Sequence, residues 1–254
     1  MSTASSGFGI SHRTIPEFRM SDVWNATWKM FSRNFRLFVS IVLVVTALVI
    51  PSVWLFLSSL LDRERPARLL AIVLSLIWML VIGELGQALV TLVVFQKLHQ
   101  QSATISANLA RLASRAIPLL LTVLAVFAIA FVGLLALIIP GLIAFTVYSV
   151  AVAVCVVEGT GPGESLSRSA AMTHFHRWRI FGLAAELAII GTVLDKIVEL
   201  VWVRAFGQSA TRFSLLLVKE LVEVVPVAFV AVAWAVAYCQ LRAIKDHELA
   251  PLAP

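Results

Sequence analysis

The sequence predicts an all-α integral membrane protein: a bundle of six transmembrane helices in three hairpins, each preceded by a cytoplasmic amphipathic surface helix. The 254-residue chain is 60% hydrophobic and only 13% charged, far from the balance of a soluble globular domain. Several apolar runs exceed the roughly 20 residues needed to cross about 30 Å of hydrocarbon. None of these runs alternates with the period of two that a barrel strand requires.

The first unit spans residues 21–98, after a polar segment, 1–20, that we expect to be a disordered cytoplasmic tail. Aromatic and basic residues then recur at helical spacing on different faces, which predicts an amphipathic helix in the lipid headgroup layer, capped by Ser21 or Asp22. The aromatic face holds Trp24, Trp28, Phe31, Phe35 and Phe38, and the polar face holds Asn25, Lys29, Arg33 and Arg36. Spans are predicted over 38–60, with a kink at Pro51, and 69–95.

The second unit spans residues 103–157 and begins with a smaller surface helix over 103–116. Its apolar face is predicted to hold Ile105, Leu109, Leu112 and Ala116, and its polar face Asn108, Arg111 and Arg115. Spans follow over 117–139 and 142–157. A tight reversal at Pro140-Gly141 would make these two spans an antiparallel hairpin.

The third unit spans residues 164–241 and follows a Gly/Pro turn in the long polar interval 157–183. A surface helix is predicted over 165–176, with Glu164 and Arg168 as an i,i+4 ion pair. Spans are predicted over 180–202 and 213–241, with a kink at Pro226. The segment 242–254 is then a short cytoplasmic tail, frayed at its end.

The junctions between surface helix and span suggest an internal repeat. Phe35-Arg36-Leu37-Phe38 and Trp178-Arg179-Ile180-Phe181 are both aromatic, arginine, aliphatic, phenylalanine quartets. With the helix over 103–116 as a degenerate middle copy, the single membrane domain 21–241 divides into three units that point the same way.

Lysine and arginine residues outside the spans fall unequally on the two sides. Thirteen lie with the termini and the surface helices: Arg13, Arg19, Lys29, Arg33, Arg36, Lys97, Arg111, Arg115, Arg168, Arg177, Arg179, Arg242 and Lys245. Five lie on the other side: Arg63, Arg65, Arg68, Arg204 and Arg212. This excess predicts that both termini are cytoplasmic. The net charge of +6 then suits an anionic lipid surface, and we expect no nucleic-acid partner.

The interval 157–183 also carries a resemblance. Its residues include Val157-Glu158-Gly159, Gly161-Pro162, Glu164-Ser165-Leu166, Arg168-Ser169, Met172-Thr173 and Trp178-Arg179-Ile180-Phe181-Gly182-Leu183. With Arg33-Asn34-Phe35 before the first span, this pattern resembles the bacterial YciC-like and glycerophosphodiester-phosphodiesterase membrane-domain families, helical membrane proteins of largely unknown activity. The resemblance covers residues 21–241 and implies a multi-pass protein of the bacterial inner membrane.

Some members of these families carry a soluble phosphodiesterase barrel of roughly 250 residues. No segment outside the predicted spans is long enough for one, so we do not expect that activity here. The family also offers no catalytic residues to transfer to this sequence.

Ionisable residues inside the predicted spans are candidates for a specific functional site. Glu84 lies near the middle of the second span with Gln87 one turn away, and serves either a functional site or a structural contact between helices. Glu186 lies about two turns inside the fifth span. An outer cluster forms either a polar cavity or an ion-pair network, and its members are Asp195, Lys196, Glu199, Lys219, Glu220 and Glu223.

Catalytic and metal-binding motifs do not emerge from the pattern. His174 and His176 are two positions apart on a predicted helix and point about 200° apart, so they do not share a metal. No nucleophile elbow accompanies Ser165. We therefore expect no enzymatic activity, no cofactor and no metal site.

The leading hypothesis is a scaffold or lipid-handling protein whose basic, aromatic-rich surface helices engage anionic membrane lipids, a membrane-protein partner or a second copy of the chain. Tryptophan anchors depth in the headgroup layer and arginine binds phosphate. The residues predicted to do so are Trp24, Trp28, Lys29, Arg33, Arg36, Arg168, Arg177, Trp178 and Arg179. The alternative is a small-solute or ion transporter with a polar cavity around Glu84, Glu186 and the outer cluster.

Overall fold

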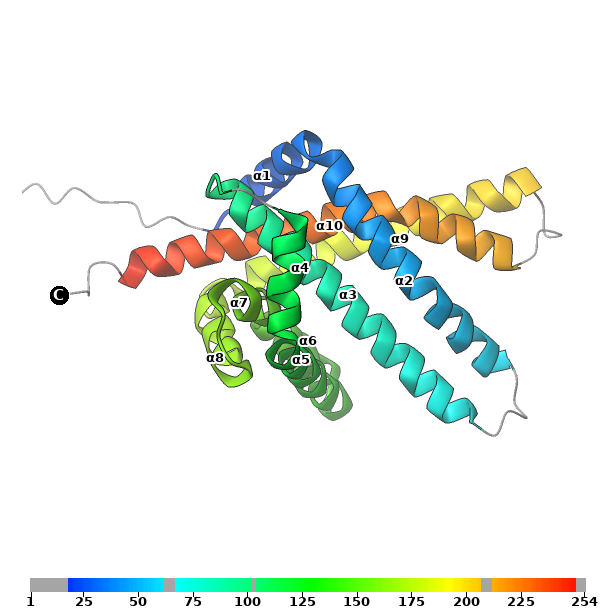
Figure 1. Cartoon of the computed structure of the whole chain (residues 1–254), viewed down its shortest axis with the longest axis horizontal. Helices are drawn as coiled ribbons and strands as arrows, with labels where there is room; N and C mark the ends of the chain where they lie inside the picture. The colour runs from blue at the N-terminus through cyan, green and yellow to red at the C-terminus, as the bar shows by residue number, and fades with distance from the viewer. Residues whose placement is uncertain (1–17, 62–66, 102–103, 207–211, 250–254) are drawn as a thin grey trace, which may run out of the picture.

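The computed structural model describes residues 18–61, 67–101, 104–206 and 212–249 (Figure 1). Within these ranges the chain forms ten α-helices and no β-strand, which confirms the all-α prediction. The helices are α1 (Met20–Arg33), α2 (Phe35–Leu61), α3 (Arg68–Leu98), α4 (Ile105–Ser114), α5 (Ala116–Ala136), α6 (Ile138–Tyr148), α7 (Ala151–Glu158), α8 (Pro162–Thr173), α9 (Arg177–Phe206) and α10 (Arg212–Leu249).

Five stretches of helix in the described residues are long and apolar enough to cross a membrane, which supports the membrane prediction. They are Phe35–Leu61, Arg68–Leu98, Ala116–Ala136, Ile138–Glu158 and Glu220–Asp246. The predicted fifth span, in α9, is not among them. Its apolar stretch is interrupted by the charged residues Glu186, Asp195, Lys196 and Glu199.

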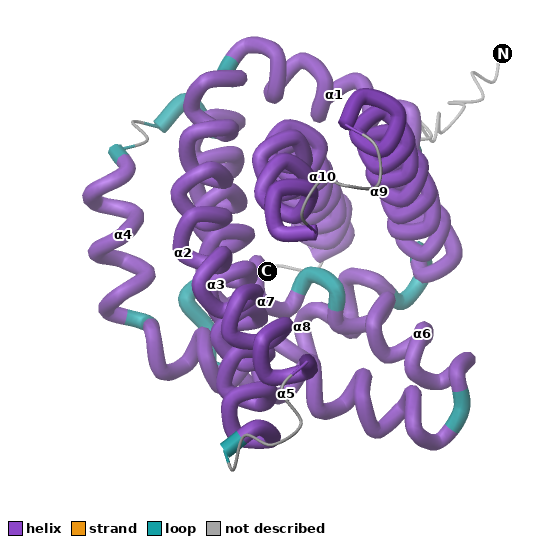
Figure 2. The backbone as a smooth tube through the Cα atoms, turned by 90° about the vertical axis from the view of Figure 1, so that its right-hand side faces the viewer, coloured by secondary structure: helices purple, strands orange, loops and turns teal. Residues whose placement is uncertain are grey.

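Helix α10 occupies the middle of the molecule (Figure 2). It packs against α1, α2, α3, α8 and α9, and its buried face supplies much of the core. Consecutive long helices also pack against each other: α2 on α3, α5 on α6, and α9 on α10. Alanine and valine dominate the buried stretch of α10 between residues 228 and 237, and these small side chains let neighbouring helices approach closely.

Helix α1, predicted to lie in the headgroup layer, packs one face against the helix bundle. Its buried face is Val23, Thr27 and Phe31, at helical spacing. The rings of Trp24 and Phe31 lie 5.5 and 5.4 Å from that of Phe229 on α10. The predicted aromatic face is therefore shared between the core and the outside.

The start of α1 also differs from the prediction. The helix begins at Met20 with Arg19 as its N-cap and no side-chain cap bond, so the predicted cap by Ser21 or Asp22 is wrong. Most of the predicted tail, residues 1–17, lies outside the described residues. Phe18, which the prediction assigned to that tail, is fully buried. The described part of the predicted tail is therefore packed against the bundle.

Helix α4 packs on the protein through Asn108 and Leu112, so the predicted apolar face is buried only in part. Asn108 is buried and exchanges two hydrogen bonds with Gln96 of α3, at 2.7 and 2.8 Å. Leu109, on the predicted packing face, is about half exposed. It lines an apolar groove of about 570 Å³ with Ile105 and residues of α2 and α3. Where the surroundings are lipid, polar groups find partners inside the protein and leucine can face outward.

The reversal between α5 and α6 occurs at Leu137, so the predicted turn at Pro140-Gly141 is wrong. Leu137 is extended (φ −168°, ψ 152°), and Pro140 lies in the first turn of α6, where its missing N–H leaves no helical hydrogen bond unmade. Gly141 instead packs on α5. A Cβ added to Gly141 would lie 2.8 Å from the backbone nitrogen of Leu134.

The predicted fourth span is broken into α6 and α7 at residues 149 and 150, a break that the sequence analysis did not predict. The carbonyl oxygen of Val147 lies at this break. It accepts hydrogen bonds from Ser169 Oγ at 2.8 Å and Thr173 Oγ1 at 3.2 Å, both on α8. These contacts satisfy a backbone group at the helix end and fix α8 against the broken span.

Candidate functional site

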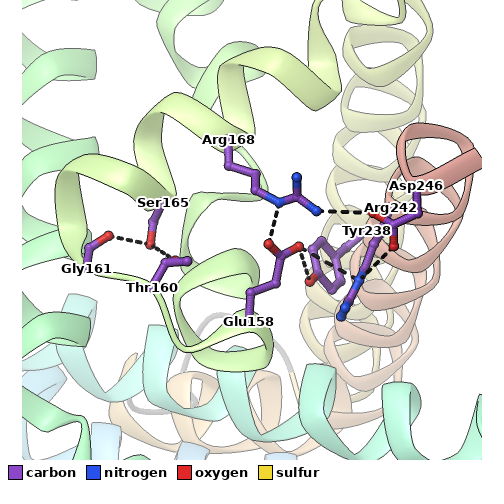
Figure 3. Close-up of polar contacts among 8 residues, drawn as sticks. All are labelled: Glu158, Thr160, Gly161, Ser165, Arg168, Tyr238, Arg242 and Asp246. Carbon is purple, nitrogen blue, oxygen red and sulfur yellow. Dashed lines mark hydrogen bonds and ion pairs between the residues drawn. The ribbon is translucent and has the colours of Figure 1, made fainter. Parts of the chain in front are cut away.

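Charged and phenolic side chains from α7, α8 and α10 meet around Glu158 (Figure 3). The Glu158 side chain is only 10% exposed, and it pairs with Arg168 through the guanidinium Nε. Arg168 Nη2 lies 3.1 Å from Asp246 Oδ1. Tyr238 donates its hydroxyl to Glu158 Oε1 at 3.3 Å. Arg242 Nε lies 3.4 Å from Asp246 Oδ2 and 3.8 Å from Glu158 Oε1.

This network balances two carboxylates with two guanidinium groups. Partial burial opposes the charge on Arg168, but the hydrogen bond and charge of Glu158, with those of Asp246, raise the pKa of Arg168 above its ordinary value. The guanidinium of Arg242 also lies 4.9 Å from the ring centroid of Phe95 on α3. We interpret the network as a structural lock that joins the C-terminal end of α7, the middle of α8 and the C-terminal half of α10.

Two predictions about this region are corrected. The partners of Arg168 are Glu158 and Asp246, so the predicted pair with Glu164 is wrong. Helix α10 continues to Leu249, so the tail predicted from residue 242 is helical over its described part. The sequence did hold one signal of the lock, since Arg242 and Asp246 lie four residues apart and pair along α10.

The turn between α7 and α8 is held by side chains of α4 and of α8. Arg111 Nη2 of α4 donates to the carbonyl oxygen of Val157 at 2.9 Å, and Arg115 donates to that of Gly159. Both arginines therefore satisfy carbonyl groups at the C-terminal end of α7. On the other side, Ser165 Oγ lies 2.7 Å from Thr160 Oγ1 and donates to the carbonyl oxygen of Gly161 at 2.8 Å (Figure 3).

Replacing Gly159 with alanine should destabilise the protein. Gly159 has a φ of +75°, and an added Cβ would lie 2.8 Å from Arg115 Nη2. We expect a loss of about 1–2 kcal/mol from the left-handed backbone alone, measured by thermal unfolding in detergent. The control is Gly163→Ala, because a Cβ at Gly163, inside α8, meets nothing within 4 Å. Equal melting temperatures for the two variants would contradict the prediction.

Three of the predicted lipid-binding residues make contacts within the protein. Trp24 Nε1 donates to Glu186 Oε2 at 2.9 Å, which joins two residues predicted for different sites. Arg168 belongs to the lock. Arg179 donates to the carbonyl oxygen of Phe18, and so holds the chain just before α1. These contacts give the three residues a structural role.

The remaining predicted lipid-binding residues lie at the surface. Trp28 is 66% exposed and Trp178 is 85% exposed. Lys29, Arg33 and Arg36 are also exposed. Arg177 is half-buried, and its buried Nε has no hydrogen-bond partner among the described residues. Exposed tryptophan beside basic residues is typical of a segment at the membrane surface.

Arg177 and Trp178 border an apolar groove of about 490 Å³ between α6 and α9. The α6 residues that line it recur at spacings of three and four, so they form one helix face. The lining residues are Ile139, Leu142, Ile143, Thr146, Arg177, Trp178 and Phe181. The apolar walls of the groove suit an acyl chain, and the guanidinium group beside them suits a phosphate, so the groove has the chemistry of a phospholipid site.

A further cavity, of about 290 Å³, is lined by Glu84 and Gln87 together with apolar and aromatic side chains, and we call it the polar cavity because of its buried polar groups. It lies between α3, α5, the broken span of α6 and α7, and α10. No described residue donates a hydrogen bond to Glu84, whereas Gln87 Nε2 donates to the carbonyl oxygen of Ala231 at 3.1 Å. The two residues predicted to act together thus line one cavity, and Glu186, which pairs with Trp24, is not among its lining residues.

The predicted outer cluster is seen in part. Lys196 Nζ lies 2.7 Å from Glu199 Oε2 within α9. Asp195, Glu220 and Glu223 also make contacts with other residues. The side chain of Lys219 lies outside the described part of the structure. No group of three or more His, Cys, Asp or Glu residues within the described ranges is placed to hold a metal ion.

The fold and these sites define a helical membrane protein with a charge lock, an apolar groove and a polar cavity. Comparison with family models, curated proteins and solved structures gives no match. The family resemblance of residues 157–183 therefore stays a prediction.

Proposed function

We propose that the chain is a six-span protein of a bacterial inner membrane, built from three units of a surface helix and a hairpin, with both termini in the cytoplasm. The span that adds to the five apolar stretches is α9, the fifth along the chain, whose 30 residues measure about 45 Å at about 1.5 Å per residue. It packs against α10, and five residues, 207–211, connect the two helices. A helix that returns beside a membrane span after so short a connection must cross the same layer.

The proposed role is non-enzymatic engagement of anionic phospholipid, with the α6–α9 groove as the specific site. The observation that carries this proposal is the groove itself, whose apolar walls end beside the exposed Trp178 and the half-buried Arg177. Among the described residues, the buried Nε of Arg177 has no hydrogen-bond partner. An acyl chain would lie against Ile139 and Ile143. Its headgroup phosphate would accept hydrogen bonds from Arg177, a charge-assisted contact of high strength.

Exposed residues of the first unit support the same role. Trp28 with Lys29, Arg33 and Arg36 forms a basic, aromatic surface beside the start of α2. Such a surface attracts anionic lipid by about 1 kcal/mol per basic residue near the membrane. This surface provides general attraction, and the groove provides a single binding position.

Native mass spectrometry of the purified chain, with added phosphatidylglycerol or phosphatidylcholine, tests this proposal. The unaltered protein should retain phosphatidylglycerol preferentially. Arg177→Gln should weaken its binding about tenfold or more, because a hydrogen bond to a charged group contributes about 1.5–3 kcal/mol. Arg177→Lys should recover part of the affinity, since lysine keeps the charge but lacks the planar guanidinium.

The matched control is Arg204→Gln, at the other end of α9, where Arg204 is exposed. It should retain phosphatidylglycerol as the unaltered chain does. Equal retention by the Arg177 and Arg204 variants would overturn the groove as the lipid site. The same spectra report whether the chain carries a second copy of itself or a membrane-protein partner.

A further inference from the structure

The polar cavity around Glu84 has a chemical character different from that of the lipid groove. Glu84 and Gln87 lie one turn apart on α3, and Thr91 continues the same face. An ionisable side chain inside a membrane-spanning helix is costly and faces a partner or a cavity. Since no described residue donates a hydrogen bond to Glu84, its carboxyl group is available to a ligand in this cavity.

Three of the polar side chains around Glu84 have already used their hydrogen-bond donors. Ser149 Oγ donates to the carbonyl oxygen of Thr146 at 3.0 Å, and Thr91 Oγ1 donates to that of Gln87 at 2.8 Å. Gln87 Nε2 donates to the carbonyl oxygen of Ala231 at 3.1 Å and to Thr91 Oγ1 at 3.5 Å, which leaves Gln87 Oε1 as an acceptor. These three groups can therefore only accept further hydrogen bonds. The cavity is suited to a ligand that is rich in donors.

Aromatic rings supply the rest of the lining. Phe127 of α5, Phe145 and Tyr148 of α6, and Trp234 of α10 all border the cavity. The face of an aromatic ring attracts a cation, and such rings together with a carboxylate are a recurrent way to bind ammonium groups. The volume of about 290 Å³ lies just below the usual range for ligand pockets, about 300–1,000 Å³, and so suits a small ligand.

We infer that this cavity binds a small organic cation with a protonated amine, with Glu84 as its counter-ion. The ammonium group donates hydrogen bonds to Glu84, Gln87 Oε1 and Ser149 Oγ, and its carbon skeleton packs against the aromatic rings. A neutral molecule of the same shape lacks both the charge and the donors. The cavity therefore discriminates by charge as well as by size.

The test uses the full chain in phosphatidylcholine nanodiscs, with empty nanodiscs as the blank. Benzylamine and benzyl alcohol are titrated at neutral pH by calorimetry, because they share a shape and differ in charge. We expect benzylamine to bind at least tenfold more tightly than benzyl alcohol. Glu84→Gln should remove this preference by weakening benzylamine alone. Glu186→Gln is the control, since Glu186 pairs with Trp24 and should leave both affinities unchanged.

Equal affinity for benzylamine and benzyl alcohol in the unaltered chain would overturn the inference without any variant. Unchanged benzylamine binding in Glu84→Gln would overturn it as well. The comparison of benzylamine with benzyl alcohol in the unaltered chain tests the inference even if Glu84→Gln does not fold. Neither measurement involves Arg177 or anionic lipid, so failure of the cation site and failure of the lipid site can be told apart.

Discussion

Replacing Arg168 with alanine should lower the free energy of unfolding by about 1.5–3 kcal/mol, because Glu158 then loses its closest cation while its side chain remains buried. Removal of one partner from a fully buried pair costs about 3–5 kcal/mol. We expect less here, since Arg242 Nε remains 3.8 Å from Glu158 and Asp246 is half exposed. The measurement is thermal unfolding of the purified protein in detergent.

Two further variants separate the lock from general effects of losing a charge. Lys196→Ala removes the cation of the exposed pair with Glu199, and its melting temperature should not change measurably. Adding Glu158→Gln to Arg168→Ala should recover part of the lost stability, because no uncompensated carboxylate then remains. If Arg168→Ala and Lys196→Ala have the same melting temperature, the lock does not contribute to stability.

Replacing Gly141 with alanine should destabilise the hairpin of α5 and α6 by about 1–3 kcal/mol, the usual cost of an overpacked contact. The added Cβ would lie 2.8 Å from the nitrogen and 2.9 Å from the Cα of Leu134. These are backbone atoms, so no side-chain rotation relieves the contact and the two helices must separate. Thermal unfolding in detergent measures the loss.

Gly191→Ala is the matched control for Gly141→Ala. Gly191 also lies within a long helix, α9, but an added Cβ there meets nothing within 4 Å. Alanine favours the helix over glycine, so this variant should melt at or slightly above the temperature of the unaltered chain. A Gly141→Ala variant that behaves like Gly191→Ala would show that α5 and α6 do not pack as closely as the structure indicates.

The helices were predictable because apolar length and composition decide whether a segment can span a membrane. The faces of those helices were less predictable. In a soluble protein an apolar side chain faces inward, but Leu109 faces outward here while Asn108 is buried. Lipid and protein interior are both apolar, so helical periodicity loses its power to tell them apart.

The sites were predictable only where the cause was local. Glu84 and Gln87 lie one turn apart on one helix, and the sequence placed them together. The lock joins Glu158 to Tyr238 and Arg242 of α10, and no spacing in the sequence indicates these contacts. The break in the fourth span was not predictable from the sequence either, because Tyr148-Ser149-Val150 contains neither glycine nor proline.

The arginines that hold the folded bundle together have an earlier task in the proposed topology. Arg111, Arg115, Arg168 and Arg179 belong to the basic side of the chain, and all four are engaged by protein groups in the finished structure. A nascent chain has none of these contacts, so the same charges are still free when the orientation of each span is decided during insertion. In the proposed topology, one set of residues has two roles in turn, orientation during insertion and stabilisation of the folded bundle.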